Sequence, residues 1–215
     1  MRKGYIFITK SGYDPGEGKH IKDPYLGDIP TIGACRPDLR KRVEPRDYLF
    51  LVSGKVKNIA QFIVGAFEID EKLDSNDAHG RFPEQHLHKR EDGQLDGNII
   101  LTSQGQQHPL DNHKNFEGRR DNYIVCKKES IVLKTPSEIL RGRKKTMAIL
   151  QEVFGKSGEI PRDIIGRMSK LNDEQVASMI RLLKSLKTNE KERVMRAAAN
   201  RYGNVGHQRP HQPTG

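Results

Sequence analysis

The sequence predicts an α+β fold, in which a small mixed or antiparallel β-barrel is followed by C-terminal helices packed to one side. Short apolar runs that end at Gly, Pro or Ser occupy the first 135 residues, whereas helical periodicity begins only after Pro136. Of the 215 residues, 34% are hydrophobic and 31% are charged, which is typical of a soluble chain with a modest core. We therefore expect a β-barrel domain, a basic helical extension and a solvated helix with a disordered tail, at residues 1–135, 136–187 and 188–215.

Five apolar runs are expected to form the strands, at residues 5–9, 47–52, 61–69, 98–102 and 122–133. The second run is continuously apolar after Asp47, which is typical of a strand buried on both faces. In the third run, Gly65 indicates a bulge or the close approach of another group. Between the strands, residues 72–96 are polar and have no period, so we interpret them as a loop excursion.

Residues 12–30 are dense in Gly, Pro and Asp and lack any period. A loop of this length inside a compact domain is either functional or disordered, and its role as a lid over a site is left open.

The best amphipathic helix follows Asn172, a predicted N-cap with Gln175 in the capping-box position. Two further helical stripes precede it, at Met147, Leu150, Val153 and Phe154, and at Ile164, Ile165, Met168 and Leu171. The break between helices at 169–172 leaves a helix-turn-helix as an alternative.

Positive charge is concentrated towards the C-terminus, because residues 1–135 hold 22 Lys and Arg against 20 Asp and Glu, whereas residues 136–215 hold 16 against 8. Such asymmetry favours a polyanion as the partner, with nucleic acid as the first choice and a merely solvated basic face as the alternative. Five cations are the candidate contacts to a nucleic-acid backbone: Arg40, Arg141, Arg143, Lys144 and Lys145.

Several functional classes lack their sequence signatures. The chain has no glycine-rich phosphate loop, no GxSxG elbow and no CxxC pair, which weighs against nucleotide hydrolases, serine hydrolases and a structural zinc site. Two cysteines make no disulfide framework and fit a reducing compartment, so a cytoplasmic location is expected. No run of about 18 apolar residues occurs, so we expect no membrane span.

The polar segment 108–113 brings His108, Asp111 and His113 within six residues. Imidazole and carboxylate groups can ligate a divalent metal, and a histidine can act as a general base, so these three are the candidate catalytic residues. The alternatives are hydrogen bonding to a ligand and a plain turn at Pro109. No other cofactor is expected.

Two further segments carry groups suited to an anion or a base. Downstream of the histidines, Phe116, Arg119 and Tyr123 alternate rings with a guanidinium that could clamp a phosphate, although Tyr123 could equally begin a core strand. A helix that begins near Pro37 would direct its positive end towards residues 31–36. No general base lies near Cys35 in the sequence, so we interpret its thiol as buried or lining a pocket.

The segments YIFIT, TIGACRPDLR, DYLFLVSG and FIVGAFEIDEKL resemble, in this order, the start of the PUA-like barrels, including the EVE and YTH-like branch. Within that group the chain looks most like the second nucleotide-modification-associated domain family of phages and bacteria. That family has a Cys-x-Pro-x-x-Arg-like segment before a Gly-Asp-apolar strand, and here Cys35 to Arg40 is followed by Arg46, in place of Gly, and Asp47. The resemblance covers residues 1 to about 135.

The resemblance implies a pocket for a nucleobase or nucleotide, possibly modified, at the barrel mouth. With the polar segments above, the expected ligand-binding residues are Thr31, Cys35, Arg36, Ser53, Gly54, Phe82, His108, Asp111, His113, Phe116, Arg119 and Tyr123. Because the chain has no Trp, an aromatic wall would need Tyr25, Phe82, Phe116 or Tyr123. We expect a binding module for nucleic acid or a nucleotide in a modification or defence system. The alternatives are a metal-dependent nuclease, phosphodiesterase or nucleotide-modifying enzyme, and a module that binds a protein partner in a phage–host or defence setting.

Overall fold

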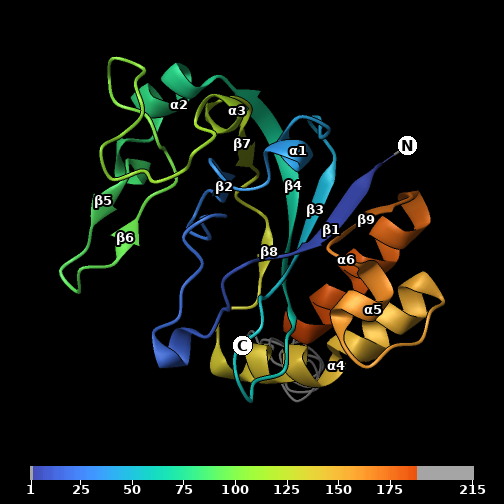
Figure 1. Ribbon diagram of the computed structural model, residues 1–215. Helices are drawn as coiled ribbons and strands as arrows, with labels where there is room; N and C mark the ends of the chain where they lie inside the picture. The colour runs from blue at the N-terminus through green and yellow to red at the C-terminus, as the bar shows by residue number, and fades with distance from the viewer. Residues whose placement is uncertain (1, 188–215) are drawn as a thin grey trace, which may run out of the picture.

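A mixed sheet with helices against it forms the centre of the molecule, as the computed structural model of residues 2–187 shows (Figure 1). The strands of this sheet are β1 (Gly4–Ile8), β2 (Thr31–Ile32), β3 (Tyr48–Val52), β4 (Ile63–Leu73), β7 (Tyr123–Cys126), β8 (Ile131–Val132) and β9 (Met168–Leu171). A separate hairpin consists of β5 (His88–Lys89) and β6 (Leu95–Asp96). The helices are α1 (Pro37–Arg40), α2 (Ser75–Arg81), α3 (Glu117–Arg120), α4 (Pro136–Phe154), α5 (Pro161–Ile165) and α6 (Asp173–Lys187), with short 3-10 turns η1 (Pro15–Glu17) and η2 (Pro83–Gln85).

The order of strands in the sheet is β2-β7-β4-β3-β1-β9, with β8 added to β4. The neighbours β1 and β3 are parallel, and the other named pairs of residues 2–187 are antiparallel. The α+β class and the packing of C-terminal helices against a mixed sheet are therefore confirmed.

The sheet is open, so the expected closed barrel is not seen in residues 2–187. Closure would require the two edge strands, β2 and β9, to pair with each other. Within residues 2–187, β9 pairs with β1 alone, from Gly4 opposite Leu171 to Phe7 opposite Met168. At the other end, β2 has only two residues. The long strand β4 pairs first with β3 and then with β7, and its register shifts between Ile69 and Glu71.

Within β4, Gly65 allows the close approach that the sequence predicted. A Cβ atom at this position would lie 2.3 Å from the carbonyl oxygen of Ile131 in β8. Any side chain here would push β8 away from the sheet.

The segment 168–171 is a strand, although its apolar spacing predicted a helical stripe. Only Ile164 and Ile165 of that stripe are helical, in α5. The unpaired edge of β1 supplies backbone partners to residues 168–171, and a satisfied ladder outweighs weak helical periodicity. The helix-turn-helix alternative is therefore wrong, because a strand separates α5 from α6.

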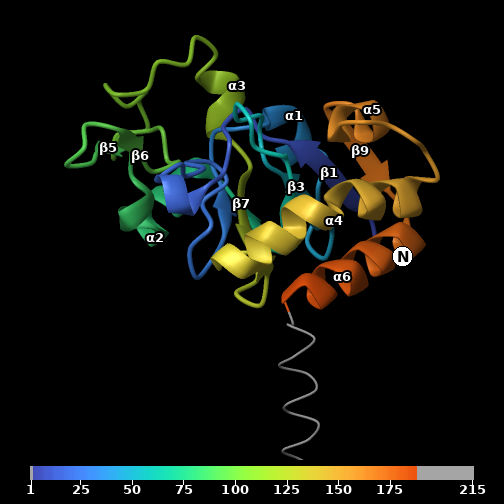
Figure 2. The ribbon, with the colours of Figure 1, turned by 90° about the horizontal axis from the view of Figure 1, so that it is seen from below.

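Helices α4 and α6 share one apolar core with the sheet (Figure 2). Leu150, Val176 and Leu183 are fully buried in it. The Thr146 hydroxyl of α4 accepts a hydrogen bond of 2.9 Å from the backbone N–H of Ile63 in β4. At the start of α6, Asn172 and Gln175 form the predicted capping box, with N–H to side-chain oxygen distances of 3.1 and 2.9 Å.

A second, smaller apolar cluster lies under the excursion between β4 and β7 and includes Phe82, Ile99 and Tyr123. The excursion is more ordered than the predicted loop, because it contains the end of β4, α2, η2, β5 and β6. Conversely, residues 98–102 form only isolated bridges at Ile99 and Leu101 in place of the predicted strand.

No helix among residues 2–187 combines the length and the apolar character that crossing a bilayer requires. The expected solvated helix and tail at 188–215 lie outside the described residues.

Candidate functional site

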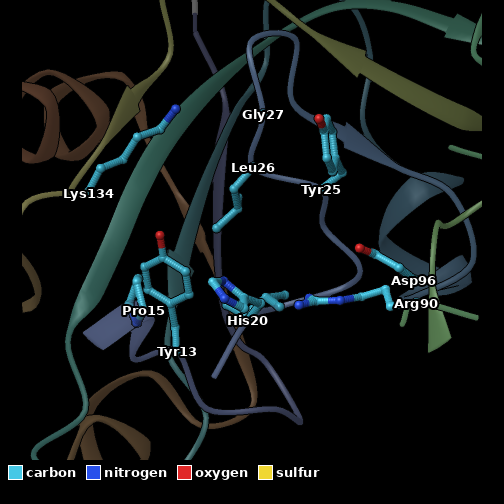
Figure 3. Close-up of a pocket in the computed structure, with 10 residues that line it drawn as sticks. Tyr13, Pro15, His20, Tyr25, Leu26, Gly27, Arg90, Asp96 and Lys134 are labelled. Atoms are coloured by element: carbon cyan, nitrogen blue, oxygen red, sulfur yellow. The ribbon is translucent and has the colours of Figure 1, made fainter. Parts of the chain in front are cut away.

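A cavity of about 400 Å³ lies between the 12–30 segment and the β5–β6 hairpin (Figure 3). The 12–30 segment supplies most of its wall, the hairpin supplies two residues, and one lysine precedes α4. The lining residues are Tyr13, Pro15, His20, Ile21, Tyr25, Leu26, Gly27, Arg90, Asp96 and Lys134. The long aperiodic loop of the sequence is therefore the main wall of this cavity.

The 12–30 segment is held in place by its own hydrogen bonds and by α4. Asp14 and Lys19 exchange backbone hydrogen bonds of 2.8 and 2.9 Å around η1, which ends at Gly18 with φ of 65°. The buried Asp14 carboxylate pairs with the Arg143 guanidinium at 2.8 Å, and that guanidinium lies 5.7 Å from the centre of the Phe62 ring. The cavity wall is thereby fixed to the helical layer.

Two tyrosine rings line the cavity from different depths. Tyr13 is nearly buried, its ring centre lies 6.1 Å from that of Phe62, and burial raises the pKa of its hydroxyl, which stays protonated at neutral pH. Tyr25 is more exposed and lies against Gly27, where a Cβ atom would come within 2.2 Å of the Tyr25 hydroxyl oxygen. Gly27 therefore sets the position of the Tyr25 ring.

Charged groups line the rest of the cavity. Figure 3 shows the Arg90 side chain extended towards His20, with Asp96 beside it. Arg90 is paired with Asp92 at 3.2 Å, an exposed contact that a ligand can replace at little cost. One oxygen of Asp96 accepts the N–H of Gly97 at 2.8 Å. A flat ligand with donors, acceptors and negative charge would match this combination of rings, cations and one carboxylate.

The predicted segment 31–36 instead surrounds a buried carboxylate. Asp23, which the sequence analysis did not select, accepts the N–H groups of Gly33 at 3.0 Å, Ala34 at 2.8 Å and Cys35. The charge of Asp23 together with burial raises the pKa of the Cys35 thiol to about 12. Cys35 is therefore a neutral thiol at physiological pH, in agreement with the prediction that it is not a nucleophile.

Thr31 and Tyr123 do meet, as expected, but inside the protein. The Tyr123 hydroxyl lies 2.9 Å from both the Thr31 hydroxyl and the side-chain oxygen of Asn98. Thr31 is fully buried and Tyr123 is 2% exposed, so neither can face a ligand in this structure. Phe82 and Phe116 are also buried, at 5% and 9% exposure, and belong to the smaller apolar cluster.

Arg40 is fully buried and serves as a hub of hydrogen bonds to backbone carbonyls. Its guanidinium donates to five carbonyl oxygens, those of Ala34, Cys35, Arg119, Asp121 and Asn122. Arg119 also donates to the Ala34 carbonyl at 3.1 Å. The prediction that Arg40 contacts a nucleic-acid backbone is wrong, because its donors are used inside the protein.

Arg36, Ser53 and Gly54 make contacts within the protein and do not line the cavity of Figure 3. Arg36 has a φ of 53°, pairs with Asp38 at 2.7 Å and lies 5.7 Å from the centre of the Phe7 ring. Ser53 and Gly54 are buried after the end of β3, where the Ser53 hydroxyl accepts the Phe62 N–H and the Gly54 N–H donates to the Ser11 carbonyl. These contacts join loops and leave the pair outside the cavity of Figure 3.

The segment 108–113 forms a turn that satisfies its own polar groups. One oxygen of Asp111 lies 2.6 Å from His113 Nδ1, and the other accepts a hydrogen bond of 2.8 Å from Gln107. His108 Nδ1 accepts the backbone N–H of Leu110 at 3.2 Å. In the part of the chain that the structure describes, no group of three His, Cys, Asp or Glu residues is arranged to hold a metal ion.

The four remaining cations of the predicted nucleic-acid face lie on α4. Arg143 is engaged by Asp14, and Arg141 donates to the Leu186 carbonyl at 2.8 Å, which joins α4 to α6. Lys144 and Lys145 are exposed. Only these two are fully presented to solvent.

Sequence reasoning missed most of the residues that line the cavity, although it identified the segment that carries them. Tyr25 was named as a candidate aromatic wall and does line the cavity. Tyr13 and His20 lie in the same aperiodic stretch 12–30, and rings in such a loop are the signal that could have revealed them. Arg90 and Asp96 had no such signal, because their place at the cavity depends on how the β5–β6 hairpin folds back.

No protein-family description, curated protein or solved structure matches the chain.

Proposed function

We propose that the protein binds a nucleobase-bearing ligand in the cavity of Figure 3. The observation that carries the proposal is the presence of Tyr13, His20 and Tyr25 around one cavity of about 400 Å³ together with Arg90 and Asp96. This volume is in the range of small-molecule sites, which are largely apolar with a few placed polar groups. Tyr25 is the one lining residue that the sequence analysis named, as a candidate aromatic wall, and none of the twelve expected ligand-binding residues lines this cavity.

Recognition would combine stacking with hydrogen bonds to the edge of the base. Stacking on an aromatic side chain contributes roughly 1–3 kcal/mol per base, and the half-buried Tyr25 ring is better placed for it than the buried Tyr13 ring. The Asp96 carboxylate can accept from amino and imino N–H groups of a base, whereas Arg90 can donate to carbonyl oxygens or a phosphate.

The proposed relationship to the PUA-like group, and to its nucleotide-modification-associated branch, draws support from one backbone feature. Arg46 occupies the position where the resemblance has Gly before Asp47, and its φ is 75°. Glycine adopts this left-handed conformation at no steric cost, so the turn keeps glycine geometry despite the substitution.

The binding role has more support than the two alternatives. An enzyme built on His108, Asp111 and His113 would need side chains directed at a substrate, and both Asp111 oxygens already have partners within the loop. A protein-docking role has no specific contact in its favour. Exposed Lys144 and Lys145 could add salt-dependent contacts to a polynucleotide backbone.

The test is calorimetric titration of the full chain with nucleosides, both unmodified and base-modified, at fixed salt. We expect saturable binding that falls about tenfold in Tyr25→Leu, since stacking is lost. The matched control is Tyr48→Leu, a half-buried tyrosine outside the cavity, which should bind as the wild type does.

Absence of binding by every nucleoside, or equal affinity of wild type and Tyr25→Leu, would refute the proposal. Equal affinity for modified and unmodified bases would remove the modification part alone.

A further inference from the structure

We infer that the ligand carries a phosphate group, which Lys128 and Lys134 hold in a second cavity adjoining the first. This inference rests on the proposed function and extends it from a nucleobase to a nucleoside phosphate. Either a free nucleotide or a phosphodiester within a polynucleotide would supply such a phosphate group.

The second cavity has a volume of about 200 Å³ and shares Gly27 and Lys134 with the first. Its lining residues are Gly27, Asp28, Pro30, Lys128, Ser130, Val132, Lys134 and Lys187. Because Lys134 lines both cavities, its ammonium group is within reach of a ligand that spans them. In Figure 3 this side chain lies at one edge of the first cavity, on the opposite side of the view from Arg90 and Asp96.

The lysines of the second cavity differ in how they are paired. Lys187 donates to the Val132 carbonyl at 2.8 Å and pairs with Glu138 at 3.1 Å, so its charge is largely neutralised. Lys128 and Lys134 are exposed, and no contact to their ammonium groups is found within residues 2–187. Asp28 is the one carboxylate on the rim, which leaves a net positive charge for an anion.

The backbone around these two lysines is fixed, although their side chains are long. The Lys134 N–H donates to a Glu138 oxygen at 2.8 Å, next to the capping box that Thr135 and Glu138 form at the start of α4. Lys128 lies in the β7–β8 turn, which the Ser130 hydroxyl closes with a hydrogen bond of 2.6 Å to the Lys127 carbonyl. Both side chains line the same cavity on a fixed backbone, which suits them to hold one phosphate together.

The experiment compares a nucleoside, its 5′-monophosphate and a short oligonucleotide of the same base by calorimetry at fixed ionic strength. We expect the monophosphate to bind at least about tenfold more tightly than the nucleoside, from one or two charge-assisted hydrogen bonds. Because Lys134 also lines the first cavity, the preference is taken as the ratio of the two affinities measured in the same variant, and in Lys128→Gln/Lys134→Gln this ratio should fall to about twofold. The matched control Lys55→Gln/Lys57→Gln removes two exposed lysines of the β3–β4 loop and should keep the full preference.

Each result has one meaning. Equal binding of nucleoside and nucleotide by the wild type would overturn the phosphate site and leave the proposed function intact, whereas absence of binding by all three ligands would overturn both. A preference that survives in the double variant would overturn the assignment to these lysines. Tighter binding of the oligonucleotide than of the monophosphate would support the site with a phosphodiester as its source, and the reverse order would support it with a free nucleotide.

Discussion

Asp23 and Tyr25 are two residues apart, yet they belong to polar sites of opposite kinds. The Asp23 carboxylate is buried and accepts three backbone N–H groups, so its hydrogen-bonding capacity is used within the protein. Tyr25 faces a cavity together with Arg90 and Asp96, and no hydrogen bond to its hydroxyl is found within residues 2–187. The comparison indicates that the fully hydrogen-bonded Asp23 shapes the segment, whereas the Tyr25 hydroxyl, and Arg90 in its exposed pair with Asp92, stay available to a ligand.

The largest expected effect is a loss of stability when the buried hydrogen-bond network around Arg40 is broken. Arg40→Met would remove its hydrogen bonds to five carbonyl oxygens, of which that of Ala34 still accepts from Arg119, and this should lower the free energy of unfolding by at least about 3 kcal/mol. Urea denaturation followed by circular dichroism measures this loss. A decrease below about 1 kcal/mol would show that water replaces the guanidinium and that the network is not the support we describe.

Asp23→Asn should cost about 2 kcal/mol in stability, because an amide accepts fewer and weaker hydrogen bonds than a carboxylate. It should also lower the pKa of Cys35, which the Asp23 charge raises to about 12. In the wild type, alkylation of the Cys35 thiol by iodoacetamide should therefore keep accelerating above pH 9, and the variant should react faster at pH 8.

The raised pKa of Cys35 also determines how the stability of the protein changes with pH. Because the folded state raises the pKa of this thiol above its ordinary value of 9.0, its contribution to stability is present below pH 9 and is lost between pH 9 and about 12. Cys126→Ser leaves one thiol for the measurement. Identical pH profiles in wild type and Asp23→Asn would contradict the electrostatic link.

At the cavity of Figure 3, Gly27→Ala should weaken ligand binding about tenfold, because the new methyl group displaces the Tyr25 ring. Titration with the tightest-binding nucleoside measures the change. Gly80→Ala is the matched control, since a Cβ atom there meets nothing within 4 Å and the residue is in α2, outside the set that lines the cavity. A wild-type affinity in Gly27→Ala would mean that the Tyr25 ring takes no part in binding.

The smallest effect is expected for Tyr123→Phe, which removes one hydroxyl from the Thr31–Asn98 network. A loss of about 1 kcal/mol in unfolding free energy is expected, with unchanged ligand binding. Comparison of urea midpoints and of the titration curves tests both halves. If binding fell while stability held, Tyr123 would belong to the ligand site after all, as the sequence first predicted.

Much of the fold follows from local patterns. The continuous apolar run after Asp47 forms β3, and Asn172 with Gln175 caps α6 as predicted. These signals are local, because backbone preference and side-chain period act within one element. The strand at 168–171 was not predictable in this way, since its ladder depends on β1, which lies far away in the sequence.

For the candidate site, too, some features follow from local sequence and others depend on contacts between distant segments. From its sequence alone, the chain determined that residues 12–30 form a polar, ring-bearing loop and that positive charge gathers towards the C-terminus. Only the tertiary structure decided that Arg40 is a buried hub, bonded to the Asn122 carbonyl 82 residues away, and that Arg90 and Asp96 face Tyr25 across a cavity. The physical reason is that a polar residue has the same sequence signature whether its hydrogen bonds go to distant backbone or to a ligand, and only the packing of remote segments decides between them.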